Sequence, residues 1–252
     1  MTNTPAPSSL RTIIVDDEEP ARRVLREYLT GMEGIDLIGE CANGFEAVKT
    51  ISEQHPDLIL LDIQMPKLNG FEVLELVDPP PAVIFATAYD QYALKAFEIH
   101  AIDYLLKPFS RERLREAVNH ARERIRKGSV LPLHAVAGAA RPAESPPERL
   151  LVKEGTRVHV IPLEKVDYVE AQDDYIAIRT EGKTHLKQQR LADLEAQLGP
   201  GRFVRVHRSY ILNLDRIARI ELYAKDSRVA ILKDGTKIPI SRGGYDKLKG
   251  LL

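Results

Sequence analysis

The stretch RTIIVDDEEP, residues 11–20, joins a short apolar run to four consecutive carboxylates. Ile13, Ile14 and Val15 form a β-rich run of the kind that is buried on both faces of a parallel sheet. Neighbouring carboxylates raise one another's pKa and destabilise the site unless a cation neutralises them. The stretch therefore predicts a buried strand whose carboxyl end presents Asp16 and Asp17 to a cation.

Length and composition indicate ordinary globular domains. The 252 residues suffice for two domains of typical size, or for one unusually large domain. No apolar run approaches the ~18 residues of a membrane span, and MTNTPAPSSLR at the N-terminus lacks the apolar core of a signal peptide. The single cysteine, Cys41, excludes an intramolecular disulfide and is interpreted as a small apolar core residue. We therefore expect a cytoplasmic protein with no membrane partner.

The two halves of the chain differ in charge and are joined by a linker-like segment. Residues 1–128 hold 15 Lys and Arg against 21 Asp and Glu, a net charge of −6, whereas residues 129–252 hold 21 against 16, a net charge of +5. The segment GSVLPLHAVAGAARPAESPPER is rich in Ala, Pro and Gly and has no amphipathic period. The predicted organisation is a disordered N-terminus over 1–10, a first domain over 11–127, a linker over 128–149 and a second domain over 150–252.

Apolar runs and helical patterns alternate five times in the first domain. The runs that predict strands are Thr12–Val15, Leu37–Gly39, Leu58–Leu61, Val83–Ala86 and Tyr104–Leu106. The helical patterns that follow them are Pro20–Leu29, Phe45–Gln54, Gly70–Leu76, Gln91–Ile99 and Arg111–Arg126. Five β-α units in series predict an α/β fold, a five-stranded parallel, doubly wound (flavodoxin-like) sheet with helices on both faces. Functional sites of such sheets lie beyond the carboxyl ends of the strands.

The carboxyl ends of four strands carry residues that together suit a phosphoryl group. They are three carboxylates, a hydroxyl and an ammonium: Asp16, Asp17, Asp62, Thr87 and Lys107. A carboxylate cluster without Cys or nearby His suits Mg²⁺ rather than zinc. Asp62, at the central position, is the candidate nucleophile that forms an acyl phosphate. Lys107 would neutralise the phosphoryl charge, and Thr87 would donate a hydrogen bond to a phosphoryl oxygen.

Each of these residues also has a purely structural interpretation. A single Asp at a strand end, such as Asp16, is commonly a helix N-cap, and a lone Thr or Lys there is commonly structural or solvated. Five such residues at one sheet edge favour a phosphoryl site over separate structural roles. The sequence does not decide whether the peptide bond between Lys107 and Pro108 is cis.

Four segments carry a resemblance that covers about residues 10–127. VDDEEPARR, DLILLDIQMPKLNGFEVL, FATAYDQYALKAFE and AIDYLLKPF resemble the receiver domain of bacterial response regulators. The resemblance implies that a histidine kinase phosphorylates Asp62. It also implies Mg²⁺ ligands from carboxylates and one backbone carbonyl, those of Asp16, Asp17, Asp62 and Gln64. Thr87 and Tyr104 match the family's switch pair, which reorients when Asp62 is modified.

In the second domain, period-two alternation is the dominant pattern. DYIAIRTEGKTHLK around Glu181-Gly182 and SRVAILKDGTKIPI around Asp234-Gly235 both predict β-hairpins. Helical patterns occur at Arg190–Leu198 and Tyr245–Leu251. The sequence therefore predicts a mostly antiparallel β domain, and it offers no catalytic constellation.

Basic side chains of this domain occur just before an apolar strand, at the start of the last helix and in the segment THLKQQR. They are Lys187, Arg190, Arg205, His207, Arg208 and Arg242. Any one of them alone is more simply interpreted as a solvated surface cation. His185 and His207 lack metal-ligand spacing and nearby carboxylate or Cys partners, so no zinc site is expected.

Three further segments, VDYVEAQDDYIAI, FVRVHRSYILNLDRI and DGTKIPISR, resemble the LytTR-type DNA-binding domain over about the last hundred residues. The resemblance implies an elongated β fold whose loops enter successive major grooves. It gives as groove-facing candidates Asp174, Tyr175, His207, Arg208 and Arg242. An Arg reads guanine through N7 and O6, whereas Lys187 and Arg190 are better placed on phosphate.

Together the two resemblances imply a two-component response regulator of the LytR/AlgR type. Phosphorylation of Asp62 would favour homodimerisation through a surface around Tyr104 and the helix Gln91–Ile99, and so sequence-specific binding to double-stranded promoter DNA. One alternative is an Mg²⁺-dependent phosphatase or phosphotransferase with the same nucleophile, although Gln64 replaces the acid that common aspartate-nucleophile phosphatases carry two residues later. Another alternative is an adaptor whose second half binds protein.

Overall fold

The computed structural model describes residues 9–128, 147–155, 157–199, 201–224 and 227–251. The chain divides into two compact units, Met1–Arg141 and Pro142–Leu252. Nearly all of the predicted disordered N-terminus and most of the predicted linker lie outside the described residues. Strands begin at Leu10 and at Arg149, each one residue earlier than the predicted domain start. Over the described residues, no helix has both the length and the apolar character needed to cross a membrane.

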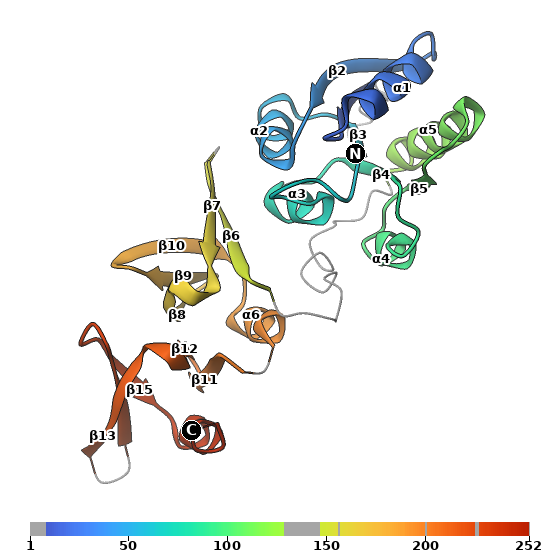
Figure 1. The fold of residues 1–252 in the computed structure, drawn as a ribbon. Coiled ribbons are helices and arrows are strands. Elements are labelled where there is room, and N and C mark those ends of the chain that lie inside the picture. The colour runs from blue at the N-terminus through green and yellow to red at the C-terminus, as the bar shows by residue number, and fades with distance from the viewer. Residues whose placement is uncertain (1–8, 129–146, 156, 200, 225–226, 252) are drawn as a thin grey trace, which may run out of the picture. The chain divides into compact units, whose positions relative to one another are not determined.

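The first unit is a parallel sheet with helices on both faces (Figure 1). Its strand order, β2-β1-β3-β4-β5, confirms the predicted doubly wound α/β fold. The elements are β1 (Leu10–Val15), α1 (Glu19–Leu29), β2 (Ile35–Cys41), α2 (Gly44–Gln54), β3 (Leu58–Leu61), α3 (Gly70–Leu76), β4 (Ala82–Thr87), α4 (Ala93–Glu98), β5 (Asp103–Leu106) and α5 (Arg111–Arg126).

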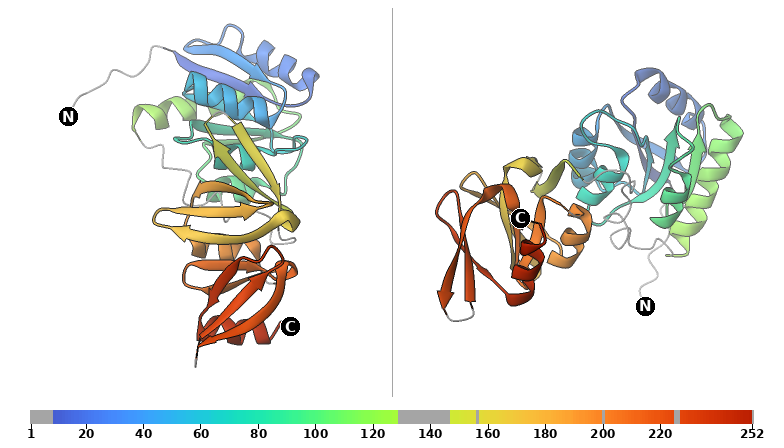
Figure 2. Two further views of the ribbon diagram at one scale, coloured as in Figure 1. Left: turned by 90° about the vertical axis from the view of Figure 1, so that its left-hand side faces the viewer. Right: turned by 60° about the horizontal axis from the view of Figure 1, so that its bottom comes forward.

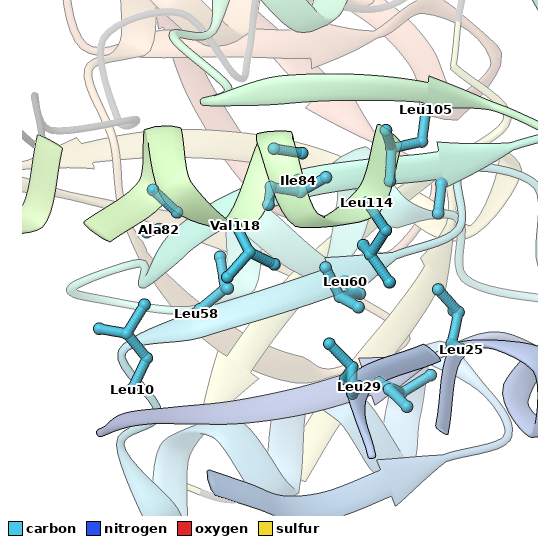
Figure 3. Close-up of a cluster of buried hydrophobic side chains, with 14 residues drawn as sticks. Leu10, Leu25, Leu29, Leu58, Leu60, Ala82, Ile84, Leu105, Leu114 and Val118 are labelled. Carbon is cyan, nitrogen blue, oxygen red and sulfur yellow. The ribbon is translucent and has the colours of Figure 1, made fainter. Parts of the chain in front are cut away.

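Helices α1 and α5 cover the same face of this sheet. Leu25 and Leu29 of α1 pack with Leu114 and Val118 of α5 and with strand residues such as Leu60 (Figure 3). Every residue of β3 and β4 is buried, as expected for central strands that are covered on both faces. Because each buried Leu, Ile or Val side chain stabilises the fold by about 1.5–3 kcal/mol, this core fixes where the chain leaves β3.

A glycine holds helix α3 close to the end of β3. Helix α3 begins at Gly70, after a capping box formed by Asn69 and Glu72. A Cβ on Gly70 would clash with the backbone oxygen of Asp62 and would lie 3.1 Å from the Cα of Ile63. Only glycine allows the helix to start this close to Asp62.

The second unit is mostly antiparallel β-structure, as predicted (Figure 2). Its sheets have the strand orders β10-β9-β8-β12-β11, β13-β14-β15 and β6-β7. The elements are β6 (Arg149–Glu154), β7 (Arg157–Pro162), η2 (Leu163–Lys165), β8 (Val166–Gln172), β9 (Tyr175–Thr180), β10 (Lys183–Gln188), α6 (Leu191–Leu198), β11 (Phe203–His207), β12 (Tyr210–Asn213), η3 (Leu214–Arg216), β13 (Ile217–Ala224), β14 (Ser227–Leu232), β15 (Lys237–Ile240) and α7 (Arg242–Lys249).

Both predicted hairpins are present, but the last helix begins earlier than predicted. The hairpins are β9-β10 and β14-β15. Helix α7 begins at Arg242 rather than Tyr245, because Ser241 caps it by accepting the N–H of Gly244 at 3.1 Å. Gly244 lies against the backbone of Val206, where a Cβ would clash with the carbonyl oxygen. This close approach docks α7 on β11.

Candidate functional site

The predicted pocket residues converge at the carboxyl edge of the parallel sheet. Asp16 follows β1, Asp62 follows β3, Thr87 ends β4 and Lys107 follows β5. The N–H of Asp62 donates to the carbonyl of Val15 at 2.8 Å, and the N–H of Lys107 donates to the carbonyl of Thr87 at 2.8 Å. These bonds extend the strand ladders past their ends, so the four side chains are held by rigid backbone.

Lys107 bridges two of the carboxylates. Its Nζ lies 2.6 Å from Asp16 Oδ2 and 3.4 Å from Asp62 Oδ2. The Asp16 side chain is fully buried, and its Oδ1 also accepts the N–H of Glu18 at 3.0 Å. One ammonium therefore faces the negative charge of two carboxylates in a largely buried setting.

The pKa shifts of this pair reflect burial and the opposing effect of each partner's charge. Burial raises the pKa of Asp16 above its ordinary value, although the hydrogen bond and the charge of Lys107 oppose that rise. Burial alone would lower the pKa of Lys107, but the hydrogen bond to Asp16 and the charge of Asp62 outweigh it and raise this pKa. Lys107 therefore stays charged, while the ionised form of Asp16 is disfavoured unless a further cation arrives.

The pocket fits a magnesium ion by its chemistry and by its spacing. Asp16, Asp17 and Asp62 each offer a carboxylate oxygen within 4.8 Å of the others. Asp62 Oδ1 and Thr87 Oγ1 are buried and have no hydrogen-bond partner among the described residues. An all-oxygen ligand set with unsatisfied acceptors suits Mg²⁺, which binds oxygen at about 2.0–2.1 Å.

The other predicted receiver residues lie around the pocket. The Gln64 side chain is exposed, and its Nε2 donates to the Tyr92 hydroxyl at 3.1 Å. The Tyr104 hydroxyl donates to the carbonyl of Tyr89, and burial followed by the charges of Asp90 and Asp62 raises the pKa of Tyr104 to about 12. The peptide bond between Lys107 and Pro108, left undecided by the sequence, is cis.

One pocket contact was missed by the sequence analysis. Arg22 of α1 donates from Nη1 to the backbone carbonyl of Asp16 at 2.7 Å. Its spacing from Asp16 places it one turn into the helix, but the same spacing equally fits a solvated surface arginine. Only the path of the chain from β1 into α1 shows that Arg22 contacts the pocket rather than solvent.

The predicted DNA-contacting residues lie at one end of the five-stranded antiparallel sheet of the second unit, β10-β9-β8-β12-β11. Gln188 of β10 pairs with Tyr175 of β9, and the N–H of Ala171 in β8 donates to the carbonyl of Ser209 at 2.9 Å. The end of β10, the β8-β9 turn and the β11-β12 turn are therefore adjacent. Six predicted residues lie along this end: Asp174, Tyr175, Lys187, Arg190, His207 and Arg208.

Arg242 reaches the same end of the sheet through the start of α7. The N–H and the hydroxyl of Ser241 both donate to the carbonyl of Val206 at 2.9 Å, so Arg242 lies beside His207. Arg208 and Arg242 are exposed, whereas His207 is half-buried and its Nδ1 accepts the N–H of Ser209 at 3.2 Å. The topology thus gathers all seven predicted residues on one edge.

The expectation that His185 has no metal-ligating partner nearby was wrong. Its ring centroid lies 4.8 Å from that of His159, whose Nε2 lies 3.0 Å from Glu154 Oε2. The β6-β7 hairpin, which the sequence analysis did not identify, brings Glu154 and His159 to His185 on β10. Spacing along the chain did not indicate this tertiary contact.

Comparison with known proteins identifies a family for each of the two units. Residues 12–119 match the response regulator receiver domain, and residues 156–252 match the LytTr DNA-binding domain. The sensory transduction protein LytT of Bacillus cereus is 35% identical over 246 residues, which cover 96% of this chain and 99% of that protein. The transcriptional regulatory protein BtsR of Salmonella typhi is 34% identical over 245 residues, covering 95% and 98%. The chain belongs to the response regulators that combine a receiver domain with a LytTr DNA-binding domain.

Proposed function

We propose that this protein is a transcription regulator controlled by phosphorylation of Asp62 by a sensor histidine kinase. The observation that carries the proposal is the pocket around Asp62. Lys107 spans Asp62 and Asp16, while Asp62 Oδ1 and Thr87 Oγ1 are buried without a partner among the described residues. A phosphoryl group on Asp62 would give the hydroxyl and the ammonium an acceptor that each can reach.

The proposed step is the transfer of a phosphoryl group to an Asp62 oxygen. That oxygen attacks the phosphorus of a phosphohistidine on the kinase, the P–N bond breaks, and the departing imidazole takes up a proton. Lys107 and Thr87 donate hydrogen bonds to the phosphoryl oxygens and stabilise the charge that develops on them. Mg²⁺, held by Asp16, Asp17, Asp62 and the Gln64 carbonyl, would neutralise phosphoryl charge when bound.

Asp62→Asn tests the nucleophile directly. The full chain is treated with acetyl phosphate and Mg²⁺, and the mass of the intact protein is measured. Wild type should gain one phosphoryl group and Asp62→Asn none, because an amide is a poor nucleophile. Asp57→Asn, at the opposite end of β3, is the matched control and should be labelled like wild type. Equal labelling of Asp62→Asn at that site would exclude this nucleophile.

We propose that the phosphorylated receiver pairs with a second copy through α4 and β5. Leu94 and Phe97 of α4 are 80% and 61% exposed, and Leu106 of β5 is also exposed. Exposed apolar side chains on two elements that contact each other suit a protein interface. The Tyr104 hydroxyl, bonded to the Tyr89 carbonyl, would move with Thr87 on phosphorylation and reshape this surface.

Sedimentation of the phosphorylated full chain tests the dimer. Wild type should shift from monomer to dimer on phosphorylation, whereas Phe97→Lys should be labelled normally and remain monomeric. Val24→Lys, which replaces an exposed apolar residue of α1, is the control and should dimerise. Phosphorylated wild type that stays monomeric while binding DNA tightly would contradict this mechanism.

We propose that the loop edge of the LytTr domain contacts double-stranded promoter DNA. The support is the adjacency of seven predicted residues on one edge, with Arg208 and Arg242 exposed. Arg208→Ala should weaken specific sites more than random DNA, because an Arg at a base edge carries sequence information. Lys187→Ala should weaken binding to both kinds of DNA. It should also reduce the slope of log affinity against log salt concentration by about one, because one phosphate contact is lost. Lys183→Ala, at the other end of β10, is the control and should change neither.

The side chain of Gln64 argues against the alternative of a phosphatase that turns over a small substrate. Gln64, the residue two positions after the nucleophile, carries an amide that donates to Tyr92 and supplies no proton for a leaving group. We propose that the chain is a regulator rather than an enzyme and acts in the cytoplasm, where promoter DNA is found.

A further inference from the structure

Three metal-ligating side chains meet where the β6-β7 hairpin contacts β10. Glu154 ends β6, His159 lies in β7 and His185 lies in β10. Glu154 Oε2 and His159 Nε2 are 3.0 Å apart, and the two imidazole centroids are 4.8 Å apart. One ligand atom from each of the three residues lies within 4.8 Å of the other two.

Both histidines lie at the margin of the hydrophobic core. His159 pairs with Val152 across the hairpin, and His185 pairs with Ile178 across β9-β10. Directly paired residues share one face of an antiparallel ladder, and Val152 and Ile178 belong to one buried cluster. The two half-buried imidazoles are therefore held on facing surfaces of the hairpin and the sheet edge by backbone pairing.

The environment leaves His185 available as a ligand. Its side chain has no hydrogen bond or ion pair within the part of the chain that the structure describes. Burial lowers the pKa of His185, and His159 lowers it further, which favours the neutral imidazole that a metal ion requires. Glu154 opposes that shift and supplies the negative charge that a cation needs.

We propose that Glu154, His159 and His185 bind a divalent transition-metal ion of the Zn²⁺ type, which fastens the β6-β7 hairpin to β10. Zinc takes imidazole nitrogen and carboxylate oxygen at about 2.0–2.2 Å, so tetrahedral ligands lie about 3.3 Å apart. The Glu154 side chain is 77% exposed and is free to close the remaining gap. A fourth position is left for water. This nitrogen-rich set differs from the all-oxygen pocket of the receiver, which suits Mg²⁺.

The hairpin is the element that such an ion would stabilise. Among the described residues it forms a two-stranded sheet of its own, and an isolated two-stranded hairpin is marginally stable in water. Its attachment depends on packing against the core, to which Leu150, Val152 and Ile161 contribute. An ion that bridges three strands binds the folded domain in preference to the unfolded chain and so raises its stability.

Zinc binding by the full chain tests the proposal. Chelator-stripped protein is titrated with Zn²⁺ by calorimetry in excess Mg²⁺, which competes for the acidic pocket, and the thermal unfolding midpoint is measured with and without Zn²⁺. The variants are His159→Gln, His185→Gln and Glu154→Gln. His120→Gln, on the receiver, is the matched control. Circular dichroism verifies the fold of each variant.

Wild type and His120→Gln should bind one Zn²⁺ that raises the unfolding midpoint. His159→Gln and His185→Gln should lose this ion and the shift, and Glu154→Gln should bind about tenfold more weakly. Glu154 is exposed, so Glu154→Gln is expected to fold, and it tests the proposal even if a histidine variant does not fold. Absence of Zn²⁺ binding by wild type, or binding to all three variants at wild-type affinity, would overturn the proposal.

Discussion

Lys107→Ala is expected to destabilise the receiver domain by about 3 kcal/mol without Mg²⁺ at mildly alkaline pH. Lys107 Nζ lies 2.6 Å from Asp16 Oδ2, and the Asp16 side chain is fully buried. Removing one partner of a buried ion pair costs about 3–5 kcal/mol, because the remaining charge stays buried and unpaired. The low end applies because the Lys107 side chain is 19% exposed and the N–H of Glu18 still donates to Asp16.

The destabilisation of the receiver domain by Lys107→Ala should decrease as the pH falls. Burial already raises the pKa of Asp16 in the wild type, and Lys107 opposes this rise. Without Lys107 the pKa of Asp16 in the folded state rises further, while that of the unfolded state stays ordinary. The folded variant then binds a proton more readily than the unfolded variant does, so acidification through the folded pKa stabilises the variant relative to wild type.

Hydrogen exchange of the amides in β1 and β3 measures the opening free energy of this domain. Wild type and variant are compared at the same pH, so the intrinsic exchange rates cancel. Lys49→Ala, which removes an exposed lysine from α2, is the control and should change the protection by less than about 0.5 kcal/mol. Equal protection in Lys107→Ala and wild type without Mg²⁺, or a difference that grows on acidification, would refute the reasoning.

Other substitutions test the metal ligands, the docking of α7 and the acid sensitivity. Asp17→Ala should weaken Mg²⁺ binding by about tenfold in calorimetry without lowering the unfolding midpoint, because it removes one of the proposed ligands but relieves carboxylate repulsion. Gly244→Ala should destabilise the LytTr domain by about 1–3 kcal/mol in thermal melts, because the new Cβ clashes with the backbone of Val206. Burial alone would raise the pKa of Asp103, but the hydrogen bonds from Arg113, the Tyr104 N–H and His120, together with the charge of Arg113, outweigh it and lower that pKa. The stabilisation by ionised Asp103 is present above about pH 4, near the unfolded pKa, and is lost as the pH falls through the lower folded pKa. The urea midpoint of Arg113→Ala should therefore fall less on acidification than that of the wild type.

The receiver pocket was predictable because its residues lie at positions that the sheet topology fixes. Apolar runs located β1, β3, β4 and β5 to within two residues at each end, and parallel strands must present their carboxyl ends at one edge. The sheet topology therefore places Asp62 and Lys107 at the same edge, independently of the conformation of the loops between them. The parallel sheet and the helices that cover it followed from the same alternation of β and α patterns.

The features that were not predicted depend on tertiary contacts. The start of α7 is set by the Ser241 cap and by the approach of Gly244 to Val206, and neither contact leaves an apolar signal. Helix α4 is shorter at both ends than its pattern, Gln91–Ile99, suggested. The meeting of His159 with His185 depends on how the β6-β7 hairpin packs on β10, which no local period encodes.

Binding of DNA before and after phosphorylation tests most directly whether Asp62 controls the LytTr domain. Sites are selected from a random pool, and fluorescence anisotropy measures the affinity of the full chain with and without acetyl phosphate and Mg²⁺. Phosphorylated wild type should bind at least about tenfold more tightly, because pairing of two chains raises the effective concentration of the second domain. Asp62→Asn should bind like unphosphorylated wild type under both conditions. An equal rise in Asp62→Asn, or unchanged binding by wild type whose intact mass indicates full phosphorylation, would contradict control through Asp62.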